Sequence, residues 1–102
     1  MARHKREIPL AHPGEILLEE FLKPMDLSQN ALALALRVPS NRINQIVSGE
    51  RGISPDTALR LARFFGTTPE FWVNLQAHYD LTHARDQFEE QINREVPRRT
   101  AA

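Results

Sequence analysis

The residues best suited to chemistry lie in a short polar segment, residues 40–48. The segment contains two asparagines, a glutamine, an arginine and two serines, but no acid and no lysine. A planar amide can form two hydrogen bonds with an adenine edge, and a guanidinium can do so with guanine. Solvent-facing sides of helices are usually rich in Glu and Lys, so this composition favours recognition of DNA over simple solvation. The residues predicted to read bases are Ser40, Asn41, Arg42, Asn44 and Gln45.

The segment that must position these side chains runs from Ser28 to Gly49. Its pattern predicts two short helices, residues 29–36 and 41–48, joined by a three-residue connection, which is the arrangement of a helix-turn-helix. Ala33 is small enough to let the two helices approach closely where they cross. The apolar residues expected to fix the pair to the core are Leu32, Leu36, Ile43 and Ile46. The polar side of the second helix is therefore left facing outward.

Phosphate contacts would set the register of such a helix on DNA without reading the sequence. Gln29 lies in the first turn of the first helix, where free amides favour anions, and Arg51 follows the second helix. The residues expected to contact phosphate are Gln29, Arg37, Ser48 and Arg51. Glu50 would repel phosphate unless it pairs with Arg51 or Arg42.

The charge distribution is compatible with DNA although the net charge is zero. Residues 37–66 hold five arginines against two acids, which gives a basic middle third. The basic tail, residues 1–8, could reach DNA, contact an acidic partner or simply aid solubility. Cysteine is absent, which excludes disulfides and thiolate chemistry. No apolar run approaches the ~20 residues needed to cross a bilayer, so no membrane partner and a cytoplasmic location are expected.

The prolines and glycines of the chain fall where helices would begin or end. They predict an all-α fold of five helices, at residues 13–23, 29–36, 41–48, 55–65 and from Pro69 onward. Beyond residue 82 only a narrow apolar repeat remains, which predicts a marginal extra helix at 84–95. We therefore expect a basic tail (1–8), a DNA-binding and dimerisation domain (9–82) and a C-terminal helix with a loose tail (83–102).

The fifth predicted helix carries four large apolar side chains that belong either to the core or to a partner surface. They are Phe71, Trp72, Leu75 and Tyr79. Adjacent helical residues face about 100° apart, so one of Phe71 and Trp72 can point inward while the other meets a second copy. A homodimer would place two recognition helices in successive major grooves, about 34 Å apart, on an inverted repeat. We predict dimerisation through these four residues.

Several short motifs resemble those of the phage-repressor-like (Xre) helix-turn-helix class, through Gln29, Ala33, Ile43 and Ile46. Four stretches resemble, more narrowly, the HigA/VapI-type antitoxins: residues 12–15, 39–44, 49–53 and 69–72. The resemblance covers roughly residues 8–82. It implies a homodimer that represses its own operon and neutralises a HigB/RelE-like toxin, a ribosome-dependent mRNA endonuclease. The class often has Gly at the position of Arg37, where a positive φ costs an L-residue about 1 kcal/mol.

Three other hypotheses remain open from the sequence. Arg37 and Glu50 favour a protein-interaction module whose DNA binding is vestigial. A stand-alone repressor without a toxin has the same sequence features. A hydrolase or metal enzyme would depend on His78 and His83, whose spacing of five does not place two ligands on one helix face. No paired carboxylates, nucleophile elbow or glycine-rich phosphate loop is recognisable, so no catalytic activity and no cofactor are expected.

Overall fold

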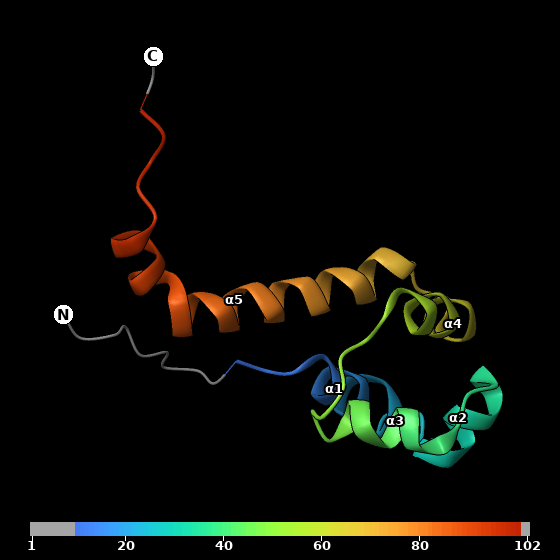
Figure 1. The fold of residues 1–102 in the computed structure, drawn as a ribbon. Helices are drawn as coiled ribbons and strands as arrows, with labels where there is room; N and C mark the ends of the chain where they lie inside the picture. The colour runs from blue at the N-terminus through green and yellow to red at the C-terminus, as the bar shows by residue number, and fades with distance from the viewer. Residues whose placement is uncertain (1–9, 101–102) are drawn as a thin grey trace.

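The computed structural model describes residues 10–100, and within that range it contains helices but no strand. The elements are α1 (Pro13–Ile16), η1 (Leu17–Leu22), α2 (Gln29–Leu36), α3 (Ser40–Val47), α4 (Pro55–Phe65) and α5 (Pro69–Glu95). Figure 1 shows α5 running along one side of the other helices and extending beyond them at its C-terminal end. The all-α prediction is confirmed. The predicted basic tail, residues 1–8, lies outside the described residues.

The first predicted helix has two parts with different geometry. His12 caps α1, because its Nδ1 accepts a hydrogen bond from the Gly14 N–H at 2.9 Å. The continuation, η1, is a π-helix, in which the Lys23 N–H donates to the Leu18 carbonyl five residues earlier. Its wider turn brings residues five apart closer to one face, and Leu17 and Leu22 are both buried. The sequence predicted an ordinary α-helix over 13–23, which is wrong for this second part.

Close contact between α1 and α3 depends on Gly14. A Cβ atom at this position would lie 1.7 Å from the Ile46 carbonyl oxygen, so no larger residue fits without moving one of the helices. The absence of a side chain therefore fixes how near α1 comes to the helix that carries the candidate recognition residues.

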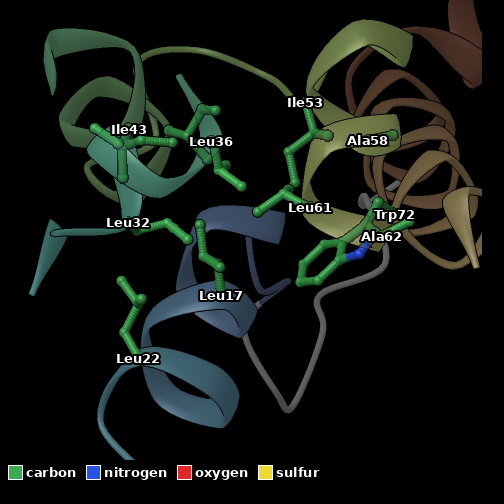
Figure 2. Close-up of a cluster of buried hydrophobic side chains, with 12 residues drawn as sticks. Leu17, Leu22, Leu32, Leu36, Ile43, Ile53, Ala58, Leu61, Ala62 and Trp72 are labelled. Atoms are coloured by element: carbon green, nitrogen blue, oxygen red, sulfur yellow. The ribbon is translucent and has the colours of Figure 1, made fainter. Parts of the chain in front are cut away.

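A single apolar core lies between all the helices. Its large members come from η1, α2, α3, α4 and α5, and Figure 2 shows Leu17, Leu61 and Trp72 converging on its centre. Trp72 is completely buried, and its Nε1–H donates to Thr67 Oγ1 at 2.8 Å. Burying a large apolar side chain contributes roughly 1.5–3 kcal/mol. The predicted core residues of the helix pair, Leu32, Ala33, Leu36, Ile43 and Ile46, are all buried.

The turn between α2 and α3 has the strained conformation expected from the resemblance. Arg37 is left-handed, with φ 60° and ψ 45°. The next N–H, that of Val38, bonds to the Ala33 carbonyl at 3.1 Å and closes the end of α2. The predicted start of the following helix is wrong by one residue, since Ser40 is its first helical residue and Pro39 is the cap. The reason is that the Pro39 carbonyl, with no help from a side chain, accepts the N–H of Arg42 at 3.1 Å.

α5 is one continuous helix of 27 residues, and not a fifth helix followed by a marginal sixth. Thr82 is the last buried residue among those described, so the expected boundary at 82/83 marks the end of burial but no break in the helix. The apolar repeat of residues 84–96 does not enter the core, and Phe88, Ile92 and Val96 are exposed. None of the helices within residues 10–100 is long and apolar enough to span a bilayer.

Candidate nucleic-acid interface

The outer face of α3 carries three polar side chains that are free for a ligand. Ile43 and Ile46 are completely buried and anchor the opposite side of the helix. Ser40, Asn41 and Asn44 are exposed, and within residues 10–100 their side chains form no hydrogen bond. One hydroxyl and two amides therefore face outward together, which is the arrangement that reading a base edge requires.

Arg42, predicted to read a base, instead contacts α4. Its Nη1 donates to Asp56 Oδ2 at 2.9 Å, and its side chain is only 28% exposed. The same Asp56 oxygen accepts a hydrogen bond from Arg60 Nε at 3.1 Å. Hydrogen bonds from Arg60 first, and from Arg42, lower the pKa of Asp56, so the carboxylate stays charged and holds both cations. Arg42 is thus held within the chain in this structure, and its contact with a base stays a prediction.

The end of α3 and the loop after it form a compact hydrogen-bonded group. Gln45 is not free either, because its Oε1 accepts from Arg51 Nε at 2.9 Å. The Gln45 carbonyl also accepts the N–H groups of Glu50 and Arg51 at 2.9 and 3.2 Å. Ser48 Oγ donates to Glu50 Oε2 at 2.9 Å, so Glu50 pairs with a hydroxyl, whereas the sequence had left open a pair with Arg51 or Arg42. Gln45 therefore positions Arg51 in this structure, while the Arg51 side chain remains exposed.

At the start of α2, the structure brings a predicted phosphate contact next to a predicted base contact. Ser28 Oγ accepts the Ala31 N–H at 3.0 Å and caps the helix. The half-buried Gln29 and the exposed Asn44 line one groove between α2, α3 and η1. Arg37 is exposed at the opposite end of α2 and makes no ion pair in the described part of the chain. The phosphate candidates thus flank the outer face of α3.

Two residues that support this surface were not singled out in the sequence. One is Asp56, whose i,i+4 spacing to Arg60 could have indicated their ion pair. The other is Gln76 of α5, whose Oε1 accepts the Ile53 N–H at 2.8 Å and whose Nε2 donates to Asp80 Oδ1 at 2.9 Å. Gln76 anchors the loop that carries Arg51, and no local signal predicts a contact across 23 positions.

The four predicted dimer residues do not form one exposed patch. Trp72 is fully buried in its own chain, so its assignment to an interface is wrong: its ring fills the core. Phe71 is 38% exposed, with its ring 4.9 Å from that of Trp72. Leu75 and Tyr79 are half-buried, and Tyr79 lies edge-on to His12 at 4.8 Å and stacks on His83. Phe71 remains the best placed of the four for a partner.

Comparisons with known proteins agree with this geometry. A helix-turn-helix family model matches residues 18–72, more than half of the chain. Virulence-associated protein I of Dichelobacter nodosus is 54% identical over 98 residues, covering 96% of this chain and 90% of the relative. Antitoxin HigA-1 of Vibrio cholerae is 40% identical over 78 residues, covering 76% of this chain and 73% of the relative.

A solved structure gives the same result for the fold. The Pseudomonas aeruginosa antitoxin HigA with the higBA promoter is 47% identical, with a TM-score of 0.85 over 87% of this chain and 97% of that chain. The resemblance to HigA and VapI inferred from the motifs is confirmed. On sequence and fold together, the chain belongs to the helix-turn-helix family.

Proposed function

We propose that the protein is an antitoxin that binds operator DNA and represses its own transcription in the cytoplasm. The observation that carries the proposal is the outer face of α3, where Ser40, Asn41 and Asn44 are exposed and form no hydrogen bond within residues 10–100. The similarity to antitoxins, one of them solved with promoter DNA, supports the same function.

In this proposal α3 enters the major groove. Its eight residues span about 12 Å at about 1.5 Å per residue, comparable with a groove about 12 Å wide. Asn41 and Asn44 read base edges, while Gln29 and Arg51 bind phosphates on either side and Arg37 adds a further contact. The Ser48 hydroxyl donates to Glu50 and is therefore not assigned a phosphate. Arg51 reaches the backbone from a position set by Gln45, whose amide thereby serves the phosphate contact.

We also propose that the protein is a homodimer, with an interface farther along α5 than the sequence predicted. Leu81, Phe88 and Ile92 are each about half exposed, at 54%, 49% and 49%. Their spacing of seven and four residues places them on one face of the helix. This part of α5 extends beyond the other helices (Figure 1), so a second copy can cover it without disturbing the core. Two copies related by a twofold axis would match an operator whose sequence is an inverted repeat.

A HigB/RelE-like toxin is the second proposed partner, as the antitoxin relatives suggest. Co-expression tests it: the chain should restore growth to cells that produce a HigB/RelE-like toxin. A chain that binds its own promoter but never restores growth would instead be a stand-alone repressor.

Binding to the chain's own promoter, measured across salt concentrations, tests the DNA proposal. Asn41→Ala and Asn44→Ala should each cost about 1–3 kcal/mol and relax preference at one base pair. Arg51→Ala should weaken all sequences alike and flatten the salt dependence. A uniform loss for all three variants would contradict this division of roles. Salt-insensitive or absent promoter binding would favour the interaction module, for which Glu50 beside Arg51 is the supporting feature.

A further inference from the structure

One surface carboxylate joins the three helices around the helix-turn-helix. Asp56 Oδ2 accepts from Arg42 of α3 at 2.9 Å and from Arg60 of α4 at 3.1 Å. Arg60 Nη1 in turn donates at 2.8 Å to the carbonyl of Leu36, the last residue of α2. A continuous chain of charge-assisted hydrogen bonds therefore runs from α3 through α4 to the end of α2.

The consequence concerns Arg42, the sole cation in α3. A mobile arginine on a recognition helix attracts the phosphates of every DNA sequence, whereas amides discriminate between bases. In the structure the Arg42 guanidinium is turned toward α4, and its charge is balanced by Asp56. The exposed groups of α3 are left as the uncharged side chains of Ser40, Asn41 and Asn44.

We propose that Asp56 is a specificity-determining residue: by holding Arg42 against α4, it suppresses sequence-independent attraction between α3 and DNA. The inference rests on the proposed binding of operator DNA. Asp56 does not touch a base in this scheme. It acts through Arg42, and its removal releases a cation at the DNA surface.

Glu70 is a control for Asp56, because both are acids in the first turn of a helix, where an acid ordinarily stabilises the helix through its dipole. The sequences Ser54-Pro55-Asp56 and Thr68-Pro69-Glu70 begin α4 and α5 in the same way. In both, the hydroxyl caps the helix by accepting an N–H, at 3.3 Å for Ser54 and 3.1 Å for Thr68. Within residues 10–100, however, the Glu70 side chain makes no hydrogen bond or ion pair. Both acids benefit from the helix dipole, but Asp56 alone holds cations.

The experiment measures binding to an operator duplex and to a scrambled duplex of equal length over a range of salt. Non-specific complexes with about 6–10 phosphate contacts have Kd values of roughly 10⁻⁴–10⁻⁶ M, so each contact contributes roughly two- to tenfold. Asp56→Asn should therefore bind the scrambled duplex roughly two- to tenfold more tightly, with a salt slope steeper by about 0.9. Operator binding should change less, so the specificity ratio falls.

Three further variants identify the cause. Glu70→Gln should leave both affinities at the wild-type level. Adding Arg42→Ala to Asp56→Asn should return the affinity for the scrambled duplex to the wild-type level. Asp56→Glu retains the negative charge, so its affinity for the scrambled duplex should stay close to that of the wild type. Thermal melting checks each fold, and Asp56→Ser replaces Asp56→Asn if the amide disturbs the first turn of α4.

If Asp56→Asn and Asp56→Ser weaken binding to both duplexes equally, the proposal is overturned. Asp56 would then serve only to hold the helices together. A gain that persists without Arg42 would overturn it as well. Failure of the proposed function is a different result, because there the wild-type protein itself would not prefer the operator over the scrambled duplex.

Discussion

The two halves of α5 behave differently although they form one uninterrupted helix. Residues 69–82 contribute Trp72 and Leu75 to the core and bind the neighbouring loop through Gln76. Beyond Thr82 almost every side chain is exposed, and two ion pairs, Arg85–Glu89 and Arg94–Glu90, are of the i,i+4 type on the helix's own surface. Surface pairs of this kind contribute little stability. The first half is therefore part of the fold, and the second half is an exposed surface, which in our proposal a second copy of the chain covers.

Trp72→Ala tests the first half and should give the largest effect. Removing a fully buried aromatic side chain should lower the free energy of unfolding by about 3–5 kcal/mol, measured by urea denaturation. Phe71→Ala, at the adjacent and partly exposed position, is the matched control and should cost clearly less. Equal losses would mean that both rings are core. If Trp72→Ala does not fold, Trp72→Phe still tests the position, because it removes the hydrogen bond to Thr67 and part of the buried ring.

Phe88→Ser combined with Ile92→Ser tests the second half. The free energy of unfolding of the protomer should change little, because both side chains are half exposed. The dimer should dissociate, and operator affinity should fall roughly 10²–10⁴-fold, the range by which joining two binding modules raises avidity. Light scattering after size exclusion gives the oligomeric state and a gel shift gives the affinity. Asn93→Ser is the control, and a double variant that stays dimeric would place the interface elsewhere.

The sequence was informative where local chemistry decides the structure. Proline and hydroxyl pairs such as Ser54-Pro55 mark helix starts because their bonds are made within one turn. The buried positions of α2 and α3 follow from helical spacing, and the left-handed Arg37 follows from the motif's turn. The main local error, the π-helical geometry of η1, depends on which leucines the core demands, and that is a tertiary effect.

The candidate site was only partly predictable for the same reason. Side-chain type indicated that Ser40, Asn41 and Asn44 could read bases, and they are exposed as expected. The same reasoning could not show that Arg42 is held by Asp56, 14 positions away, or that Gln45 holds Arg51. An exposed apolar stripe and a core stripe also have the same periodicity, so spacing alone could not assign Trp72 and Phe88 to different environments.

His12 links the first half of α5 to α1 and gives the smallest predicted effect. Burial lowers the pKa of His12 below its usual 6.5, while Asp80 of α5 and Glu15 of α1 oppose the shift. The aromatic ring that faces it is that of Tyr79. The unfolded chain therefore takes up a proton before the folded one does. The free energy of unfolding should be independent of this group above pH 6.5 and should fall as the pH drops below it.

The cap of α1 also requires an unprotonated Nδ1 on His12. Nδ1 of His12 accepts the Gly14 N–H, and a proton on that nitrogen would abolish the bond. His12→Asn keeps a capping oxygen but does not titrate, so the slope between about pH 5.5 and 6.5 should be smaller in the variant. The difference must stay below about 1.4 kcal/mol per pH unit, the limit for one proton. Urea denaturation at several pH values measures it, and identical slopes would show that His12 titrates alike in both states.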